Sequence, residues 1–200
     1  MELPGLFDET HALGFRRRYR LELVRSTRLD VAVTRLRLST IDLTEQELSR
    51  IERVRLVLAE LHAVALDAEA HALMARRSAR AQLLRLERLL NQDRVRIRVA
   101  PLAGWSPDFS VFSDERGPRS VLVGFHAFEV PHPYAGPALG AHFGKPEATV
   151  ASRRFEEVWA RGHDVAPAIR TIFQRAGRWS RHPDRGWGPR NPVDTLPALG

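Results

Sequence analysis

Cysteine is absent from this chain of 200 residues. The chain can therefore form no disulfide, no thiolate metal site and no cysteine nucleophile. It also contains no apolar run near the roughly 18 to 20 residues that a membrane span requires. Its first nine residues, which include Glu2, Asp8 and Glu9, lack the basic-then-apolar layout of a signal peptide. These absences predict a cytoplasmic protein that does not associate with membranes.

Lysine is almost absent too, because Lys145 is the only one and 30 of the 31 basic residues are arginine. Such a bias is typical of a GC-rich genome, and many of the arginines lie beside Asp or Glu. With a formal net charge of +7, an arginine-rich solvated surface is the main interpretation. The alternative is an anionic partner, either a nucleic acid or a phosphorylated ligand.

The first hundred residues show alternating helix and strand patterns. Phe15, Tyr19 and Leu23 recur every four residues and predict a helix with one apolar face. Alternation and β-branched residues predict strands over 29–38, with one apolar face from Leu29 to Val33, and over 54–58 and 95–99. Thr44 and Glu47 have the spacing of a capping box and predict a short helix. The stretch 67–90 lacks proline and glycine and predicts the longest helix.

After residue 100 the pattern changes. Residues 108–112 and 120–124 predict a β-hairpin closed by a turn over 113–118. Residues 125–146 are dense in Gly, Pro, His and aromatics, which indicates a long loop. A loop of that length in a compact domain is usually either functional or wrongly assigned. Two helices are expected around 155–159 and 169–173. We expect one α/β domain over 1–176, a mixed β-sheet flanked by helices, and an irregular Gly/Pro/Arg-rich tail over 177–200.

Three stretches resemble a half-unit of the phospholipase D-like fold. They are 29–33, 53–58, and the hairpin 108–124 followed by the Phe-x-x-x-Trp helix of 155–159. The resemblance spans about residues 12–165. Active members of that family use a His-x-Lys motif, in which the histidine attacks phosphorus and the lysine stabilises the phosphoryl oxygens. Here those positions fall near Ser106 and Asp108, and an aspartate would repel a phosphate. The resemblance therefore implies a catalytically inactive domain that senses a ligand or binds a protein, and that pairs as a homodimer.

The residues expected to bind a ligand lie in the hairpin and the following loop. They are Asp108, Ser110, His126, Glu129, His132, Tyr134 and His142. The spacings of the three histidines match no tight metal pattern, so we expect neither a metal nor a cofactor. The segment that ends in Gly144-Lys145 lacks the full phosphate-binding loop pattern.

Arginine clusters are the candidate contacts for an anion or a nucleic acid. They are Arg16, Arg17, Arg18, Arg76, Arg77 and Arg80, and no recognised nucleic-acid-binding signature accompanies them. Two alternatives to the inactive domain remain. One is a phosphodiesterase or nuclease that uses the loop histidines, and the other is an arginine-rich accessory protein that binds nucleic acid with a steep salt dependence.

Overall fold

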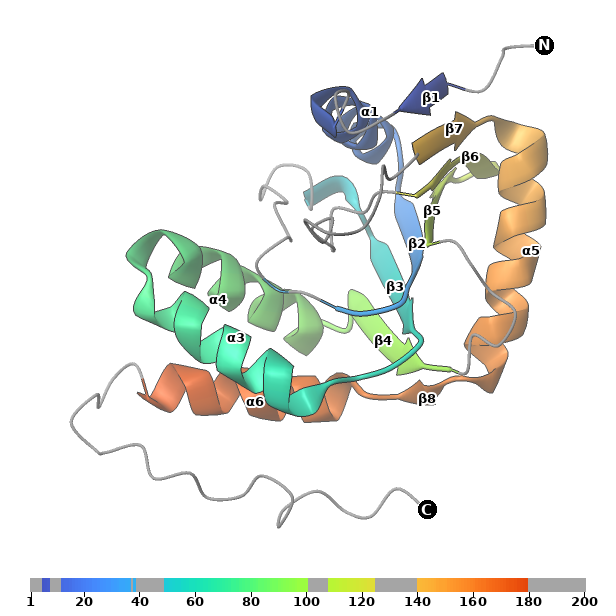
Figure 1. Ribbon diagram of the computed structural model, residues 1–200. Coiled ribbons are helices and arrows are strands. Elements are labelled where there is room, and N and C mark those ends of the chain that lie inside the picture. The colour runs from blue at the N-terminus through green and yellow to red at the C-terminus, as the bar shows by residue number, and fades with distance from the viewer. Residues whose placement is uncertain are drawn as a thin grey trace.

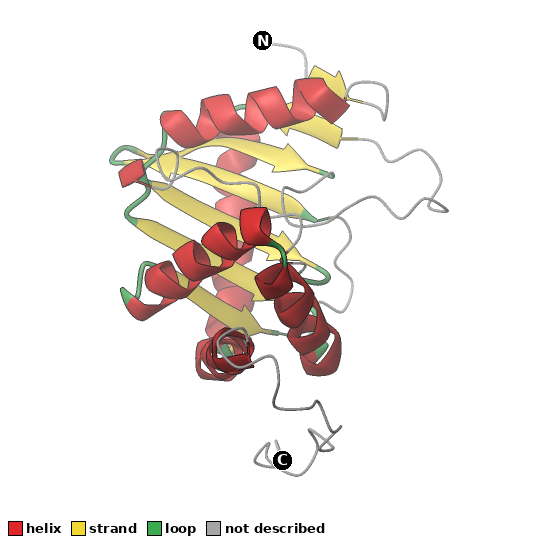
Figure 2. Ribbon diagram, turned by 90° about the vertical axis from the view of Figure 1, so that its left-hand side faces the viewer, coloured by secondary structure: helices red, strands yellow, loops and turns green. Residues whose placement is uncertain are grey.

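The computed structural model describes residues 5–7, 12–36, 38, 49–100, 108–124 and 140–179. They form one mixed β-sheet with helices on both faces (Figures 1 and 2). Across the sheet, the strands in this part of the chain are β1 (Gly5–Phe7), β7 (Gly140–Phe143), β6 (Gly117–Val123), β5 (Phe109–Asp114), β2 (Arg28–Val33), β3 (Arg53–Leu58), β4 (Val95–Val99) and β8 (His163–Asp164). The helices are α1 (Ala12–Val24), α3 (Ala63–Ala75), α4 (Arg77–Asn91), α5 (Lys145–Arg161) and α6 (Ala166–Trp179). The predicted mixed sheet flanked by helices is confirmed.

The centre of the sheet is parallel and its flanks are antiparallel. Strands β2, β3 and β4 run parallel, with Val31 opposite Leu56 and Leu56 opposite Ile97. Strand β5 pairs antiparallel with β2, and the remaining neighbours are antiparallel as well. All residues of β2 and β3 after the first are buried. The prediction of a single apolar face for 29–33 was therefore too narrow, because parallel strands at the centre of a sheet are covered on both sides.

Each face of the sheet has its own apolar core. Alternate residues of the parallel strands, such as Leu29 and Leu56, pack in one cluster with residues of α1, α3, α4 and α6. The intervening residues, such as Ala32 and Val57, belong to a second cluster with Phe155 of α5. In the described part of the chain, α1, α3, α4 and α6 thus lie on one face and α5 lies on the other. We refer to the latter as the α5 face (Figure 1).

The stretch predicted as the longest helix is divided into α3 and α4. Arg76 adopts an extended backbone with φ of −94° and ψ of 117° between the two helices. Leu73 at the end of α3 and Leu83 in α4 are both buried in the same core. A single straight helix would carry one of these faces away from the sheet, so tertiary packing produces a break that neither glycine nor proline signals.

The hairpin of β5 and β6 follows the prediction, with a tighter turn. Asp114 lies opposite Gly117, and the carboxylate of Asp114 accepts a hydrogen bond from the Arg116 amide at 2.8 Å. Gly117 has a φ of +107°, a conformation that side chains with a Cβ rarely adopt. The turn therefore depends on glycine at this position.

Three further boundaries differ from the sequence-based expectation. The strand expected over 29–38 ends at Val33 as β2, because the chain leaves the sheet there toward the next crossover. Strand β7, which pairs with β6, lies inside the segment predicted as a long loop. Its Ala141 and Phe143 pair with β6. Helix α6 continues to Trp179, beyond the expected boundary at residue 176. The expected capping box at Thr44 and Glu47, and residues 180–200, lie outside the described residues. Among the helices that the structure describes, none has the length and apolar character needed to cross a membrane.

Candidate ligand-binding site

A pocket opens at the carboxyl ends of β2 and β3. Its cavity volume is about 500 Å³, within the range of small-molecule sites. Eight residues from the segments after the two strands and from the first turns of α3 line it: Arg35, Leu36, Glu60, Leu61, His62, Ala65, Leu66 and Glu69. Open α/β sheets bind ligands at the carboxyl ends of their strands. The position of the pocket therefore matches the usual place of a ligand site.

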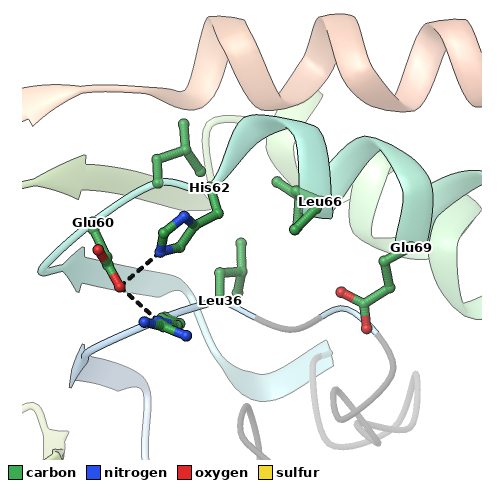
Figure 3. Close-up of a pocket in the computed structure, with 8 residues that line it drawn as sticks. Leu36, Glu60, His62, Leu66 and Glu69 are labelled. Carbon is green, nitrogen blue, oxygen red and sulfur yellow. Dashed lines mark hydrogen bonds and ion pairs between the residues drawn. The ribbon is translucent and has the colours of Figure 1, made fainter. Parts of the chain in front are cut away.

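One wall of the pocket is charged and centres on Glu60 (Figure 3). The Oε1 atom of Glu60 accepts a hydrogen bond from Nε of Arg35 at 2.6 Å and lies 2.7 Å from Nε2 of His62. The hydrogen bond from His62, followed by that from Arg35, holds the pKa of the Glu60 carboxyl below its ordinary value. Glu60 therefore remains a carboxylate at neutral pH. When His62 is neutral and donates through Nε2, its Nδ1 is an acceptor.

The opposite side combines apolar side chains with a second carboxylate. Leu36 and Leu66 project between the Glu60 wall and Glu69 (Figure 3). One oxygen of Glu69 accepts a hydrogen bond from the backbone amide of Leu38 at 3.0 Å. This bond holds the carboxylate against the segment after β2. Two carboxylates and one guanidinium thus surround an apolar floor. This arrangement suits a small amphipathic molecule whose polar end donates hydrogen bonds.

Asp108 lies beside the strand end that leads into the pocket and is absent from its lining. Its Oδ1 accepts hydrogen bonds from the amide and the hydroxyl of Thr34, at 2.8 and 3.1 Å. Thr34 directly precedes Arg35, so Asp108 positions the chain that supplies the charged wall. Ser110 is buried on β5, opposite Val31.

Of the five ligand-binding candidates that the sequence places in the loop after the hairpin, the structure describes only His142. His126, Glu129, His132 and Tyr134 lie outside the described residues. His142 lies on β7 and takes part in a different arrangement, in which its Nε2 is 3.6 Å from Glu22 Oε1 and 3.1 Å from Nη2 of Arg18.

Glu22 is the buried centre of that arrangement, which we call the Glu22 cluster: Glu22, Arg18, Arg119, Ser120 and His142. The side chain of Glu22 is 2% exposed and lies 3.0 Å from Arg18 and 3.1 Å from Arg119. Ser120 donates a hydrogen bond to it at 2.7 Å. Burial would raise the pKa of Glu22, but the neighbouring His142 imidazole, the hydrogen bond from Ser120 and the charge of Arg18 outweigh it and lower the pKa to about 2. The cluster ties α1 to β6 and β7.

The predicted anion contacts are dispersed over the molecule. Arg17, Arg76 and Arg80 are exposed, whereas Arg18 belongs to the Glu22 cluster. The side chains of Arg16 and Arg77 lie outside the described residues. Within the residues that the structure describes, no group of three or more His, Cys, Asp or Glu side chains could hold a metal ion.

The pocket residues Arg35, Glu60, His62 and Glu69 were not predicted from the sequence. They lie in connections without a chemical motif. Arg35 and Glu60 each follow a strand of the structure, β2 and β3, by two residues. Polar residues at the carboxyl ends of neighbouring parallel strands are candidates for a site even when no motif joins them.

Comparisons with known proteins identify the fold and leave the chemistry open. No family model matches the chain, and no curated protein matches it. Among solved structures, TrmBL2, described as an archaeal chromatin protein with a novel mode of DNA binding, has a TM-score of 0.51 at 8% identity. The match covers 82% of this chain and 54% of the TrmBL2 chain, so the chain spans about half the length of that protein. At this identity the likeness extends to the fold alone.

Two phospholipase D-type structures are also among the neighbours. Nuc from Salmonella typhimurium, a phospholipase D family member, has a TM-score of 0.45 at 12% identity, covering 81% of this chain and 97% of that chain. NucT from Helicobacter pylori has a TM-score of 0.48 at 9% identity, covering 81% and 98%.

Proposed function

We propose that this chain is a non-catalytic phospholipase D-like domain that binds a small amphipathic ligand in the pocket at the carboxyl ends of β2 and β3. The pocket itself carries the proposal. It has the volume of a ligand site, an apolar floor, and polar groups that are held in place before any ligand arrives. A ligand would pack its apolar part on Leu36 and Leu66 and direct a donor group toward Glu60 or Glu69.

The residues around the pocket favour binding over phosphoryl transfer. None of its eight lining residues is a lysine, the residue that stabilises the phosphoryl oxygens in active phospholipase D-like proteins. Asp108, which the family resemblance aligns with the lysine position, is instead bonded to Thr34. A carboxylate at that position repels the phosphoryl oxygens that a lysine would stabilise. A regulatory role, in which the bound ligand alters the association of this domain with a partner chain or a second copy, is part of the same proposal.

Filling the pocket should weaken the binding of 1-aminoanthracene, a fluorescent aromatic amine with an apolar body and one donor group. We expect the unmodified protein to bind one equivalent with a saturable rise in fluorescence. Ala65→Trp introduces a bulky ring at an exposed residue of the pocket lining, and should weaken binding by at least about tenfold, or 1.4 kcal/mol. Fluorescence titration measures both constants.

Ala72→Trp is the matched control, because Ala72 is exposed on the same helix and lies two turns further along. It should change the affinity by less than about twofold. Equal binding by both variants would show that the probe binds elsewhere and would remove the support for this pocket.

Nucleic-acid binding is a second candidate function. The net charge is +7, and TrmBL2, which shares the fold, is described as a DNA-binding chromatin protein. The candidate predicts binding that weakens steeply with salt, since each phosphate contact releases counterions.

A further inference from the structure

The α5 face carries a row of arginines at the amino ends of the parallel strands. Arg28 begins β2 and lies directly opposite Arg53, which begins β3. Arg55, two residues after Arg53 on β3, lies directly opposite Arg96 on β4. Side chains two residues apart in a strand share a face. Because Arg55 and Arg98 both contact Trp159 of α5, Arg53 and Arg96 belong to the same face.

Helix α5 engages only part of this row. It packs against β6, β5, β7 and β2, and its Glu156 bonds Arg55 at 2.6 Å. Arg98 donates to the carbonyl of Trp159 at 2.7 Å. Arg55 and Arg98 are therefore held by the helix, whereas Arg28 and Arg96 are exposed and Arg53 is half-buried. We call Arg28, Arg53 and Arg96 the arginine edge.

The arginine edge lacks compensating negative charge. In the part of the chain that the structure describes, none of its three side chains forms an ion pair, and Nε of Arg53 is buried without a hydrogen-bond partner. The two carboxylates that act on Arg53, Asp30 and Glu156, are both bonded to Arg55. Like charges directly opposite each other in a sheet are destabilising. An anion bound across the edge would relieve that repulsion.

The chemistry of the edge favours phosphate groups in a row. Guanidinium groups bind phosphate oxygens with paired hydrogen bonds. The edge crosses three strands, about 10 Å, on the order of the length over which one nucleic-acid strand carries three phosphates. The exposed large apolar residues of the described chain are Leu21, Val24, Val64, Leu84 and Val150. None of these lies on β2, β3 or β4, so the edge lacks the apolar centre of a protein interface.

We propose that the arginine edge binds the phosphodiester backbone of a nucleic acid. This inference rests on the second candidate function and specifies its surface, which differs from the arginine clusters that the sequence suggested. The contact would read backbone charge and not base sequence, because guanidinium groups on phosphates position a nucleic acid without reading its bases.

A fluorescently labelled 20-bp DNA duplex of mixed sequence tests the proposal by anisotropy across a series of salt concentrations. The triple variant Arg28→Gln/Arg53→Gln/Arg96→Gln should bind at least tenfold more weakly at 0.1 M salt. Loss of three phosphate contacts should also reduce the slope of log K against log[salt] by about 2 to 3. The control triple Arg17→Gln/Arg76→Gln/Arg80→Gln removes the same charge from exposed sites elsewhere and should stay within about threefold of the unmodified protein.

Three other outcomes would contradict the inference, and each points to a different explanation. No binding by the unmodified protein at 50 mM salt would remove nucleic-acid binding altogether. Loss of binding in the control triple only would keep that function and reject the arginine edge as its site. Binding to phosphatidylcholine–phosphatidylserine vesicles without binding to DNA would assign the charge to a lipid surface. If circular dichroism shows that the edge triple is unfolded, the single variant Arg96→Gln should reduce the slope by about 0.9, and an unchanged slope rejects the proposal.

Discussion

Replacing Arg55 with methionine should lower the free energy of unfolding by about 3 to 5 kcal/mol. Arg55 bonds both oxygens of Asp30, with Nε to Oδ1 at 2.6 Å and Nη2 to Oδ2 at 2.7 Å. The side chains of both residues are less than one-tenth exposed. The variant would leave the Asp30 carboxylate buried without its charged partner. It would also remove the contacts that Arg55 makes with Glu156 and with the ring of Phe155 on α5.

Urea denaturation followed by circular dichroism measures this loss. Arg154→Met is the matched control, since Arg154 pairs with Glu157 on the surface of α5 and both side chains are about half-exposed. Its cost should be below about 1 kcal/mol. The double variant Asp30→Leu/Arg55→Met should recover much of the lost stability, because apolar residues can replace a buried ion pair. A cost for Arg55→Met no greater than that for Arg154→Met would contradict the buried pair.

Glu22→Gln should cost about 3 kcal/mol at pH 7, the second largest effect. The pKa of Glu22 is lowered from 4.5 to about 2 in the folded protein, and each pKa unit corresponds to about 1.4 kcal/mol. Because the folded pKa lies below the unfolded one, this contribution is complete above about pH 4.5. It is lost as the pH falls toward 2, when the carboxyl becomes protonated in both states.

The difference in unfolding free energy between the unmodified protein and Glu22→Gln is the quantity to follow. Denaturation at a series of pH values should show it shrinking between pH 4.5 and 2. Glu157→Gln, on the exposed surface of α5, should show a small difference at every pH. A difference for Glu22→Gln that stays constant down to pH 2.5 would mean that the Glu22 cluster does not hold the carboxylate charged.

Local sequence patterns predicted most of the elements because their residues repeat with the period of the structure. Tyr19 and Leu23 of α1 occupy one buried face, and the alternation over 54–58 and 95–99 corresponds to β3 and β4. The break at Arg76 was not predictable from local signals, since it arises from packing between α3, α4 and α6. The short strand β7 pairs with β6, and its four residues are too few to show a period.

The pocket escaped prediction for a related reason. Composition favours the segment that is richest in histidine and aromatic residues as a site, whereas the pocket uses Arg35, Glu60 and His62 from connections without a motif. These residues lie close together because β2 and β3 are neighbouring parallel strands whose carboxyl ends lie side by side. The arginine edge left a clearer trace, because Arg53 and Arg55, like Arg96 and Arg98, alternate with apolar residues inside predicted strands. The sequence does not show that these arginines lack carboxylate partners, because that depends on which side chains the fold brings together.

The pocket and the arginine edge lie at opposite ends of the same parallel strands. The carboxyl ends of β2 and β3 carry the pocket, and the amino ends of β2, β3 and β4 carry the edge. A small ligand and a polyanion could therefore bind without competing for residues. Testing 1-aminoanthracene against Arg53→Gln and DNA against Ala65→Trp would separate the two surfaces.

Hydrolysis of bis(p-nitrophenyl) phosphate and of single-stranded DNA tests most directly whether this domain binds ligands or performs phosphodiester chemistry. We expect no hydrolysis above buffer for the folded protein, with or without a chelator. Asp108→Ala and His126→Ala should then match the unmodified protein. Hydrolysis by the unmodified protein that is lost specifically in His126→Ala would contradict the account and place a catalytic centre in the histidine-rich segment.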